Sequence, residues 1–293
     1  MAAQQKQQQR QKEEEEAPEQ HPGAAVYTPW VLAFYDMWVL WFSCTYIWKC
    51  STSRVLLPLF RASMGRRHLD IGVGSGYFPA RALGDAAAAA PPPCRELTIV
   101  DLNPHALEAT RRRVEHAAAG AGRRVRVTAV LADVTRAPLP LGAGEPETAT
   151  AGAGGGGAPQ HRQQPQPQAP RFDSASIFFL LHCLPGPPAT KLAAVLDAVT
   201  PLLGDEATLV GATILGVGRP LGWAARWLLA AYNRRGIFGN AADSEDVLAE
   251  GLRRRFRHVD VWCVGAVMLF RARGPKDVED GGGREGGRAV AAA

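Results

Sequence analysis

The feature that most limits how this chain can fold is a glycine-rich turn within residues 67–78, RHLDIGVGSGYF. A short apolar strand with Leu69 and Ile71 leads into the turn, and a helix is predicted from 77 to 83. The three glycines lie at alternate positions, Gly72, Gly74 and Gly76. Glycine permits positive φ and a close approach of a ligand to the main chain. A strand, a glycine turn and a helix in this order predict a cradle for a nucleotide-like ligand.

Asp70 indicates which kind of ligand this cradle holds. In the dinucleotide fingerprint G-x-G-x-x-G a third glycine would stand where Tyr77 is found, and Asp70 lies two residues before the first glycine. A carboxylate there would repel a pyrophosphate but would suit a cationic amino group. S-adenosylmethionine carries an ammonium and a sulfonium, so Asp70 favours this cofactor over NAD.

Two more strands are followed by acids. The predicted strand 97–100 ends on Asp101, and Asn103 and Pro104 then suit the N-cap and first turn of a helix. Asp101 is thereby placed at the carboxyl edge of the strand, where an acid can accept hydrogen bonds from ribose hydroxyls. The predicted strand 124–131 leads to Asp133. NAD enzymes need no such third acid, so the trio favours S-adenosylmethionine.

Together these residues resemble the class I S-adenosylmethionine-dependent methyltransferases, and in particular a branch that acts on small molecules in bacteria and fungi. The first motif is Asp70-x-Gly72-x-Gly74-x-Gly76, and the similarity extends over residues 35–273. Other matching segments are Trp48-x-Cys50-x-Thr52, Asp101-Leu102-Asn103-Pro104, His182-Cys183-Leu184-Pro185-Gly186 and Thr213-Ile214-Leu215-Gly216. The resemblance implies that Asp133 bonds the adenine amino group and that Val134 offers its N–H to the ring. The predicted cofactor-binding residues are Asp70, Gly72, Val73, Gly74, Gly76, Asp101, Leu102, Asp133 and Val134.

The alternation of strands and helices predicts the α/β class, with a Rossmann-like, doubly wound sheet. The apolar run 172–181 is typical of a central parallel strand. A helix from 191 to 203, with Gly204 as its C-cap, and a strand from 207 to 214 follow. A helix from 245 to 255 precedes a hairpin, 259–264 and 266–273, around Gly265. This agrees with the family's seven-stranded, mostly parallel sheet, in which the last strand is antiparallel.

Composition predicts the domain limits. Residues 1–24 and 274–293 are low-complexity tails, which we expect to be disordered. One methyltransferase domain is predicted from 25 to 273, with cap helices within 25–63 and a Gly-, Ala-, Pro- and Gln-rich insertion at 141–170. The five cysteines are odd in number and lack C-x-x-C spacing, which favours reduced thiols, a cytoplasmic location and no metal site.

Residues 26–48 are densely aromatic and long enough to span a bilayer. Asp36 near their middle and Pro29 weigh against spanning. We therefore expect an amphipathic cap over the active site, with contact to a membrane surface as the alternative. Because methyl transfer removes the positive charge of the sulfonium, a dry apolar pocket favours it.

The predicted substrate pocket combines residues from this cap with residues from the segment 218–239, which can fold over the site. The candidates are Tyr35, Trp48, Tyr232 and Phe238. His182, at the carboxyl end of the fourth strand, is the candidate catalytic base. His68 and His105 are not favoured, because His68 precedes the first strand and His105 starts a helix.

The sequence thus predicts a methyltransferase that acts on an apolar small molecule, in secondary metabolism. One alternative is a lipid or quinone methyltransferase at a membrane surface, and another is a binding module that keeps the cofactor pocket without catalysis. A nucleic-acid partner is disfavoured, because no Asn-Pro-Pro-Tyr type motif occurs and acids flank the arginine cluster 111–113. The acceptor atom, the substrate and the oligomeric state stay open.

Overall fold

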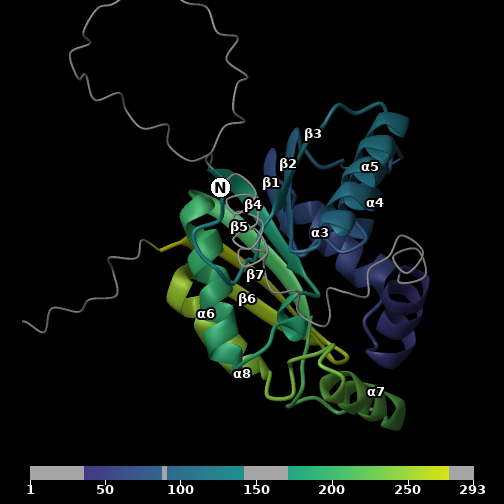
Figure 1. Ribbon diagram of the computed structural model, residues 1–293, viewed down its shortest axis with the longest axis vertical. Helices are drawn as coiled ribbons and strands as arrows, with labels where there is room; N and C mark the ends of the chain where they lie inside the picture. The colour runs from purple at the N-terminus through teal and green to yellow at the C-terminus, as the bar shows by residue number, and fades with distance from the viewer. Residues whose placement is uncertain (1–35, 88–90, 142–170, 277–293) are drawn as a thin grey trace, which may run out of the picture.

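The computed structural model describes residues 36–87, 91–141 and 171–276, and its centre is one seven-stranded sheet (Figure 1). The strands lie in the order β3-β2-β1-β4-β5-β7-β6. β1 to β5 pair in parallel, and β7 runs antiparallel to both of its neighbours. The predicted seven-stranded sheet with an antiparallel last strand is confirmed. The bounds are β1 (Arg67–Ile71), β2 (Glu96–Asp101), β3 (Arg126–Leu131), β4 (Phe172–Phe178), β5 (Leu203–Ile214), β6 (Phe256–Val264) and β7 (Val267–Pro275).

Helices cover both faces of the sheet. Figure 1 shows α3 (Leu57–Ser63), α4 (Tyr77–Leu83) and α5 (Pro104–Gly120) on one face, and α6 (Pro188–Val199) and α8 (Glu245–Arg255) on the other. α7 (Trp223–Arg234) lies beyond the end of the sheet. The strand order reverses between β1 and β4, and ligands of such sheets bind outside the carboxyl ends of the strands at this point.

Local sequence signals explain where several helices begin. Asn103 is the N-cap of α5, and its Oδ1 accepts N–H bonds from His105 at 2.9 Å and Ala106 at 3.3 Å. Ser244 caps α8 in the same way, through a 3.5 Å bond from the N–H of Val247. Both caps satisfy N–H groups that the helix itself leaves unpaired. The two helix starts agree with the prediction.

Several predicted boundaries are wrong by three or four residues: α6, β5 and β6 begin earlier than predicted, and β4 and α6 end earlier. β4 ends at Phe178 instead of 181, because Phe179 has a φ of 60° and the chain then enters a 3₁₀ turn, η4 (Leu181–Cys183). α6 ends at Val199 and is followed by a 3₁₀ turn, η5 (Thr200–Leu202), since Pro201 lacks the N–H that a continuing helix needs. Gly204 therefore lies at the start of β5 and is not a helix C-cap.

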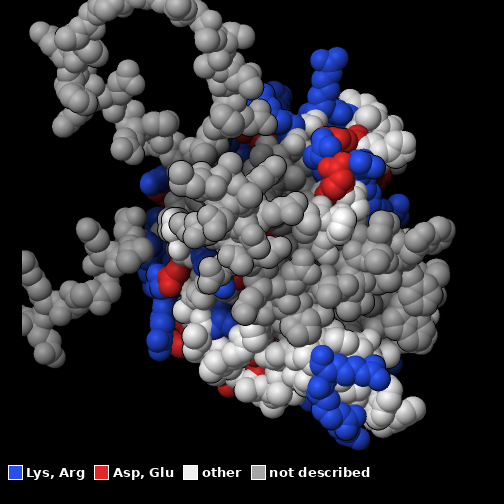
Figure 2. Space-filling model, in the orientation of Figure 1, with Lys and Arg blue, Asp and Glu red and all other residues white. Residues whose placement is uncertain are grey.

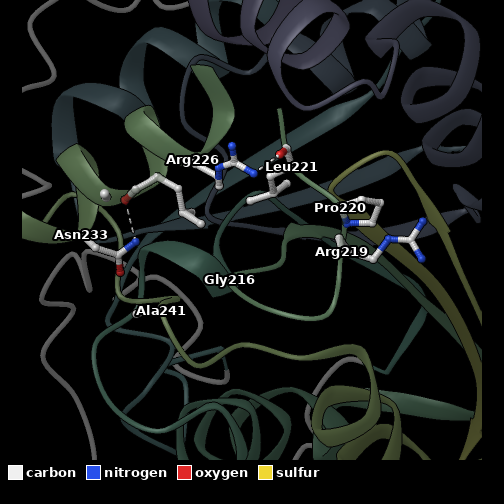
Figure 3. Close-up of a pocket in the computed structure, with 9 residues that line it drawn as sticks. Gly216, Arg219, Pro220, Leu221, Arg226, Asn233 and Ala241 are labelled. Atoms are coloured by element: carbon white, nitrogen blue, oxygen red, sulfur yellow. Dashed lines mark hydrogen bonds between the residues drawn. The ribbon is translucent and has the colours of Figure 1, made fainter. Parts of the chain in front are cut away.

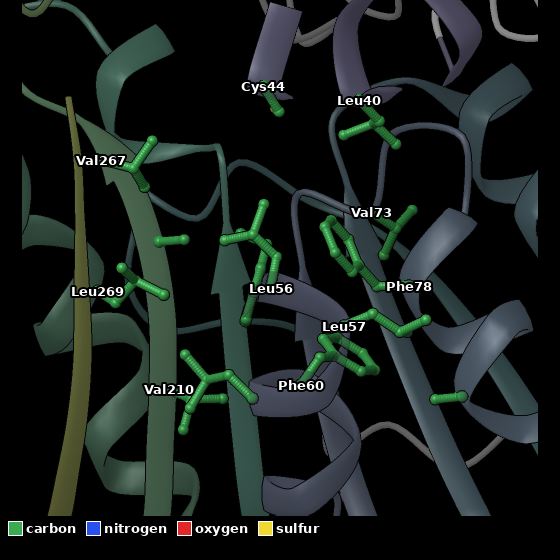
Figure 4. Packing of buried hydrophobic residues seen from close by; sticks show 14 of the residues in the cluster. Leu40, Cys44, Leu56, Leu57, Phe60, Val73, Phe78, Val210, Val267 and Leu269 are labelled. Carbon is green, nitrogen blue, oxygen red and sulfur yellow. The ribbon is translucent and has the colours of Figure 1, made fainter. Parts of the chain in front are cut away.

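The described part of the aromatic segment forms a π-helix, η2 (Asp36–Ile47), followed by η3 (Thr52–Leu56), which continues into α3. Figure 4 shows Leu40 and Cys44 of η2 above the apolar cluster that contains Leu56, Val73 and Phe78. The helical cap thus packs on the core. Within residues 36–87, 91–141 and 171–276, no helix has the length and apolar character needed to cross a membrane. The predicted tail 1–24, the predicted C-terminal tail beyond 276, residues 142–170 of the insertion and Tyr35 lie outside the described residues. The C-terminal tail was predicted to begin at 274, but residues 274 and 275 belong to β7.

Candidate active site

A cavity of about 570 Å³ opens at the carboxyl ends of β1, β2 and β4, and η2, η4 and α7 contribute to its walls. Most residues that the sequence singled out line it. Of the predicted cofactor residues these are Asp70, Gly72, Val73, Gly74, Asp101, Leu102, Asp133 and Val134. Trp48, His182, Tyr232 and Phe238 line it as well. Gly76 is not among the lining residues. The structure therefore brings together residues up to 190 positions apart in the sequence.

The three glycines of the turn have different tasks. All have positive φ, at 69°, 53° and 70° for Gly72, Gly74 and Gly76. A Cβ on Gly74 would meet nothing within 4 Å, so this main chain faces open space. On Gly76 a Cβ would lie 2.7 Å from the Thr110 side chain, and on Gly72 it would lie 3.0 Å from that of Leu180. The predicted positive φ is confirmed at all three glycines. Gly72 and Gly76 also leave room for packed side chains, while their predicted contact with the cofactor stays a prediction.

The glycine turn is held by groups on both sides. Thr110 and Arg113, one turn apart on α5, donate to the carbonyl oxygens of Gly74 at 3.2 Å and Ser75 at 3.0 Å. On the other side, Oδ2 of Asp101 accepts the N–H of Gly74 at 3.2 Å. These bonds fix the turn between β2 and α5, so the main chain at Gly74 is preorganised next to the cavity.

Asp70 is a buried acid at the cavity whose pKa is strongly raised. Its side chain is buried, and burial raises the pKa of the carboxyl from 3.8 to about 7. A hydrogen bond from Ser176 opposes this shift, and the charge of Asp101 adds to it. Burial also raises the pKa of Asp101. Two neighbouring acids that are largely buried form a site in which a bound cation would stabilise the ionised carboxylates.

A buried hydrogen-bond chain leads to Asp70 from the opposite end of β1. The register pairs His68 with Ser174 and Asp70 with Ser176, on adjacent strands. Ser174 Oγ accepts the N–H of Gly65 at 2.7 Å and lies 2.7 Å from His68 Nδ1. His68 Nε2 lies 2.8 Å from Ser176 Oγ, which donates to Asp70 Oδ1 at 2.5 Å.

The direction of this chain follows from its last donor. Ser176 has one hydroxyl hydrogen and donates it to Asp70, so it accepts from Nε2–H of His68. A neutral ring has one N–H, so Nδ1 is an acceptor and Ser174 donates to it. Burial lowers the pKa of His68 to about 3, so the ring is neutral. The sequence analysis did not favour His68 as a functional residue, whereas the structure connects it to the Asp70 carboxylate through Ser176.

Asp133 and Val134 form the third part of this wall. Asp133 Oδ1 accepts bonds from the N–H of Thr135 at 2.9 Å and from its hydroxyl at 2.6 Å. The Asp133 side chain is 15% exposed, and Arg136 lies 3.6 Å from Oδ2. The carboxylate thus stabilises its own turn while remaining at the cavity.

The other end of the cavity is aromatic. The ring centroid of Phe238 lies 4.5 Å from that of His182, 4.9 Å from that of Tyr232 and 6.3 Å from that of Trp48. Phe179, which the sequence analysis missed, lies 5.7 Å from His182. Its positive φ is rare for an aromatic residue and turns the chain sharply beside the cavity. One cavity therefore has an acidic end and an apolar, aromatic end.

No protein-family model matches the chain. It is 41% identical to the O-methyltransferase NEC2 of Pyricularia oryzae, over 86% of this chain and 92% of that protein. The chain belongs to the class I S-adenosylmethionine-dependent methyltransferases. It is also 39% identical to an O-methyltransferase of Aspergillus niger, over 73% of this chain and 92% of that protein. It shares 35% identity with the physcion biosynthesis cluster O-methyltransferase of Aspergillus chevalieri, over 87% of this chain and 96% of that protein.

The predicted enzyme class and cofactor are confirmed, and the acceptor of this methyltransferase is a small molecule. The cavity fits the cofactor on two observations. The open main chain at Gly74 leaves room for a ligand against the backbone. The raised pKa of Asp70 marks a carboxylate that a neighbouring ammonium would stabilise.

The surroundings of His182 differ from those of a catalytic base. Burial, with the nearby charge of Lys191, lowers the pKa of His182 to about 3. Its Nδ1 lies 3.5 Å from both the N–H of Ile214 and the hydroxyl of Thr213. Nδ1 is thus the acceptor, and the ring proton lies on Nε2. A base this weak takes up a proton unfavourably at neutral pH, and the predicted base role stays a prediction that His182 variants test.

Behind the aromatic end of the methyltransferase lies a fully buried ion pair. Lys191 Nζ is 2.8 Å from Asp243 Oδ2, and the two side chains are 1% and 0% exposed. The ammonium also donates to the carbonyl oxygens of Gly239 at 2.9 Å and Leu184 at 3.3 Å, and both of these residues line the cavity. The sequence analysis missed the pair, since Lys191 appears as a single charge at the start of a helix.

Proposed function

We propose that this methyltransferase transfers a methyl group to a hydroxyl oxygen of an aromatic secondary metabolite. The observation that carries the proposal is the division of one cavity into an acidic end and an aromatic end. The similar proteins of Pyricularia oryzae and Aspergillus niger are O-methyltransferases by name, and that of Aspergillus chevalieri is assigned to a physcion biosynthesis cluster. Aromatic walls favour a flat apolar acceptor through stacked and edge-to-face contacts.

In this proposal the acidic end holds the cofactor. Asp70 binds the ammonium, Asp101 accepts from the ribose hydroxyls, and the main chain at Gly74 approaches the ligand. Asp133 and Val134 lie at the adenine. When bound, S-adenosylmethionine supplies a methyl group on a positively charged sulfur.

The aromatic end orients the acceptor and excludes water. Trp48, Phe179, Tyr232 and Phe238 surround it with apolar surface, which disfavours the charged reactants more than the neutralising transition state. Alignment of the reacting atoms can lower the barrier by about 7 to 11 kcal/mol. In place of the base role, Nε2–H of His182 is a donor that can bind the oxygen of the acceptor and fix its position. The reacting form of the acceptor is then the phenolate, whose proton has passed to water before methyl transfer, so that opposite charges are neutralised as the bond forms.

A panel of acceptors tests the proposed reaction. We expect release of S-adenosylhomocysteine and formation of methyl ethers with apolar polycyclic phenols. Matched aromatic amines, lipids and isoprenoid quinols should give much slower turnover. Mass spectrometry of the products identifies the methylated atom. Methylation of nitrogen or carbon alone, or preferred turnover of the quinols, would contradict the proposal, and the latter would favour the membrane-lipid alternative.

Two variants of His182 separate a hydrogen-bond donor from a base. We expect His182→Phe to lower kcat/KM about 3- to 10-fold, because one neutral hydrogen bond contributes about 0.5 to 1.5 kcal/mol. His182→Gln keeps a donor and should restore part of the loss. Because the pKa of His182 is about 3, the pH dependence of kcat/KM between pH 5 and 8 should be the same in the wild type and in His182→Gln. A limb near pH 6.5 that disappears in both variants would instead identify a base.

A further inference from the structure

The outer face of α7 carries large apolar side chains in water. Trp223 is 79% exposed and Trp227, one turn later, is 65% exposed. With Arg226, Ala230 and Arg234, which are also exposed, they form one stripe at helical spacing. Val217, just before the helix, is 46% exposed. Two exposed tryptophans on one helix face indicate a surface that binds a partner.

The segment that carries this face has charges of a single sign. From residue 207 to residue 242 the sequence has no Asp or Glu, whereas it has four arginines, at 219, 226, 234 and 235. Figure 2 shows basic side chains gathered at the position of α7, at the lower right of the view, without acids among them. The stripe of tryptophans thus lies within a positively charged region. Such a region attracts an anionic partner.

A groove beside the helix belongs to the same surface. It measures about 440 Å³ and lies between the loop 216–222, α7 and Ala241 (Figure 3). Arg226 reaches the carbonyl oxygen of Leu221 at 3.1 Å, and Arg219 reaches that of Gly265 at 3.1 Å. A guanidinium has five N–H donors, so one such bond does not exhaust its capacity. The groove therefore presents two arginines beside the exposed tryptophans.

The opposite face of α7 belongs to the active site. Tyr232 is nine residues from Trp223, which places it on the far side of the helix, and its side chain lines the catalytic cavity. Gly236 and Ile237, just after the helix, line the cavity as well. Whatever binds the outer face is thus one helix away from the acceptor end.

We propose that α7 is an interfacial helix that docks this enzyme on an anionic phospholipid membrane. Trp223 and Trp227 enter the headgroup region, where indole rings are favoured, and the arginines pair with lipid phosphates. A second copy of this chain fits less well, because two such faces would bring eight arginines together without acids. The docked helix would hold the cavity near the membrane, where apolar molecules gather.

Sedimentation with lipid vesicles tests the docking. The full-length protein should bind vesicles of phosphatidylcholine with phosphatidylserine, bind vesicles of phosphatidylcholine alone much more weakly, and dissociate as salt is raised. Trp223→Ala/Trp227→Ala should lower the partition coefficient about tenfold or more. Arg234→Gln/Arg235→Gln should lower it about 25-fold, since each basic residue near such a surface changes binding about fivefold. The matched control, Arg124→Gln/Arg253→Gln, removes the same charge at exposed positions outside α7 and should bind like wild type.

Three further measurements make the outcome decisive. Cofactor affinity and melting temperature of each variant report on folding. Methyl transfer to a water-soluble phenol without vesicles reports on the proposed reaction, and the α7 variants should keep it. Equal vesicle binding by wild type and the tryptophan variant would overturn the docking. The docking would also be overturned if the wild type bound no vesicles and sedimentation equilibrium found a dimer that the tryptophan variant does not form. The face would then join two copies of the chain.

Discussion

Replacing Asp70 by Asn is expected to weaken the binding of S-adenosylmethionine by about 2 to 5 kcal/mol, which is about 30- to 4,000-fold in Kd. The proposed reason is the loss of a buried carboxylate from the ammonium of the cofactor. Asp101→Ala should have a smaller effect, about 1.5 to 3 kcal/mol, because it removes hydrogen bonds from ribose hydroxyls to a charged acceptor. Isothermal calorimetry measures both. Unchanged affinity in Asp70→Asn would contradict the assignment of the ammonium site.

The affinity of the wild-type enzyme should also depend on pH through Asp70. The free carboxyl has a pKa of about 7, and a cationic ligand binds its ionised form. Affinity should therefore be highest above pH 7 and should fall by up to about tenfold for each pH unit below it. In Asp70→Asn this limb should disappear. Ser176→Ala removes the donor at the end of the His68 chain, so it should raise the pKa of Asp70 further and move the limb to higher pH.

The free enzyme should respond to Asp70→Asn in the opposite direction. The folded-state pKa of Asp70 is about 7 and the reference value is 3.8, so the folded state binds the proton more tightly. Ionisation then destabilises the fold progressively from about pH 4 to pH 7, by about 4 kcal/mol in total. Without cofactor, urea denaturation at pH 8 should find the Asn variant at least as stable as wild type. Clear destabilisation at pH 8 would indicate that Asp70 supports the fold more than it serves a ligand.

The acidic end of the cavity was predictable because its residues lie at or just after the carboxyl ends of strands. Strand periodicity and the helix start at Asn103 place Asp70 and Asp101 at the carboxyl edge of the sheet, and the residues between β3 and the insertion place Asp133 there too. In a parallel sheet all these ends lie on one side. Local sequence therefore determines their position, even though it does not determine the distances between them.

The contacts that sequence analysis missed are set by register between distant segments. His68 meets Ser176 only because β1 pairs with β4 in one register, across 108 positions. Lys191 meets Asp243 because α6 packs beside the segment that follows α7. The spacing of residues along a single helix or strand predicts neither contact. The turn at Phe179 was missed for a related reason, since tertiary packing holds an aromatic residue at a φ that its intrinsic preference opposes.

The buried ion pair behind the acceptor end should be the second site of large effects. Lys191→Met leaves the Asp243 carboxylate buried without its cation, and removing one partner of such a pair destabilises proteins by about 3 to 5 kcal/mol. Asp243→Asn should be milder, because Lys191 keeps the carbonyl oxygens of Leu184 and Gly239. The double variant Lys191→Met/Asp243→Asn should be more stable than Lys191→Met alone, since no unpaired charge remains. Urea denaturation of the four proteins gives the coupling between the two residues.

A surface pair provides the matched control for this cycle. Arg254 and Glu250 lie 3.1 Å apart with side chains 74% and 56% exposed, so Arg254→Met should change stability by less than about 1 kcal/mol. The buried pair should also affect the two ends of the cavity differently. Lys191 holds Leu184 and Gly239 at the acceptor end, so Lys191→Met/Asp243→Asn, which loses these bonds without leaving an unpaired charge, should raise the KM for the acceptor while cofactor affinity stays near wild type. Equal losses of affinity for the acceptor and for the cofactor would instead mean that the pair supports the whole fold. Equal stability of Lys191→Met and Arg254→Met would mean that the ion pair is not buried in solution.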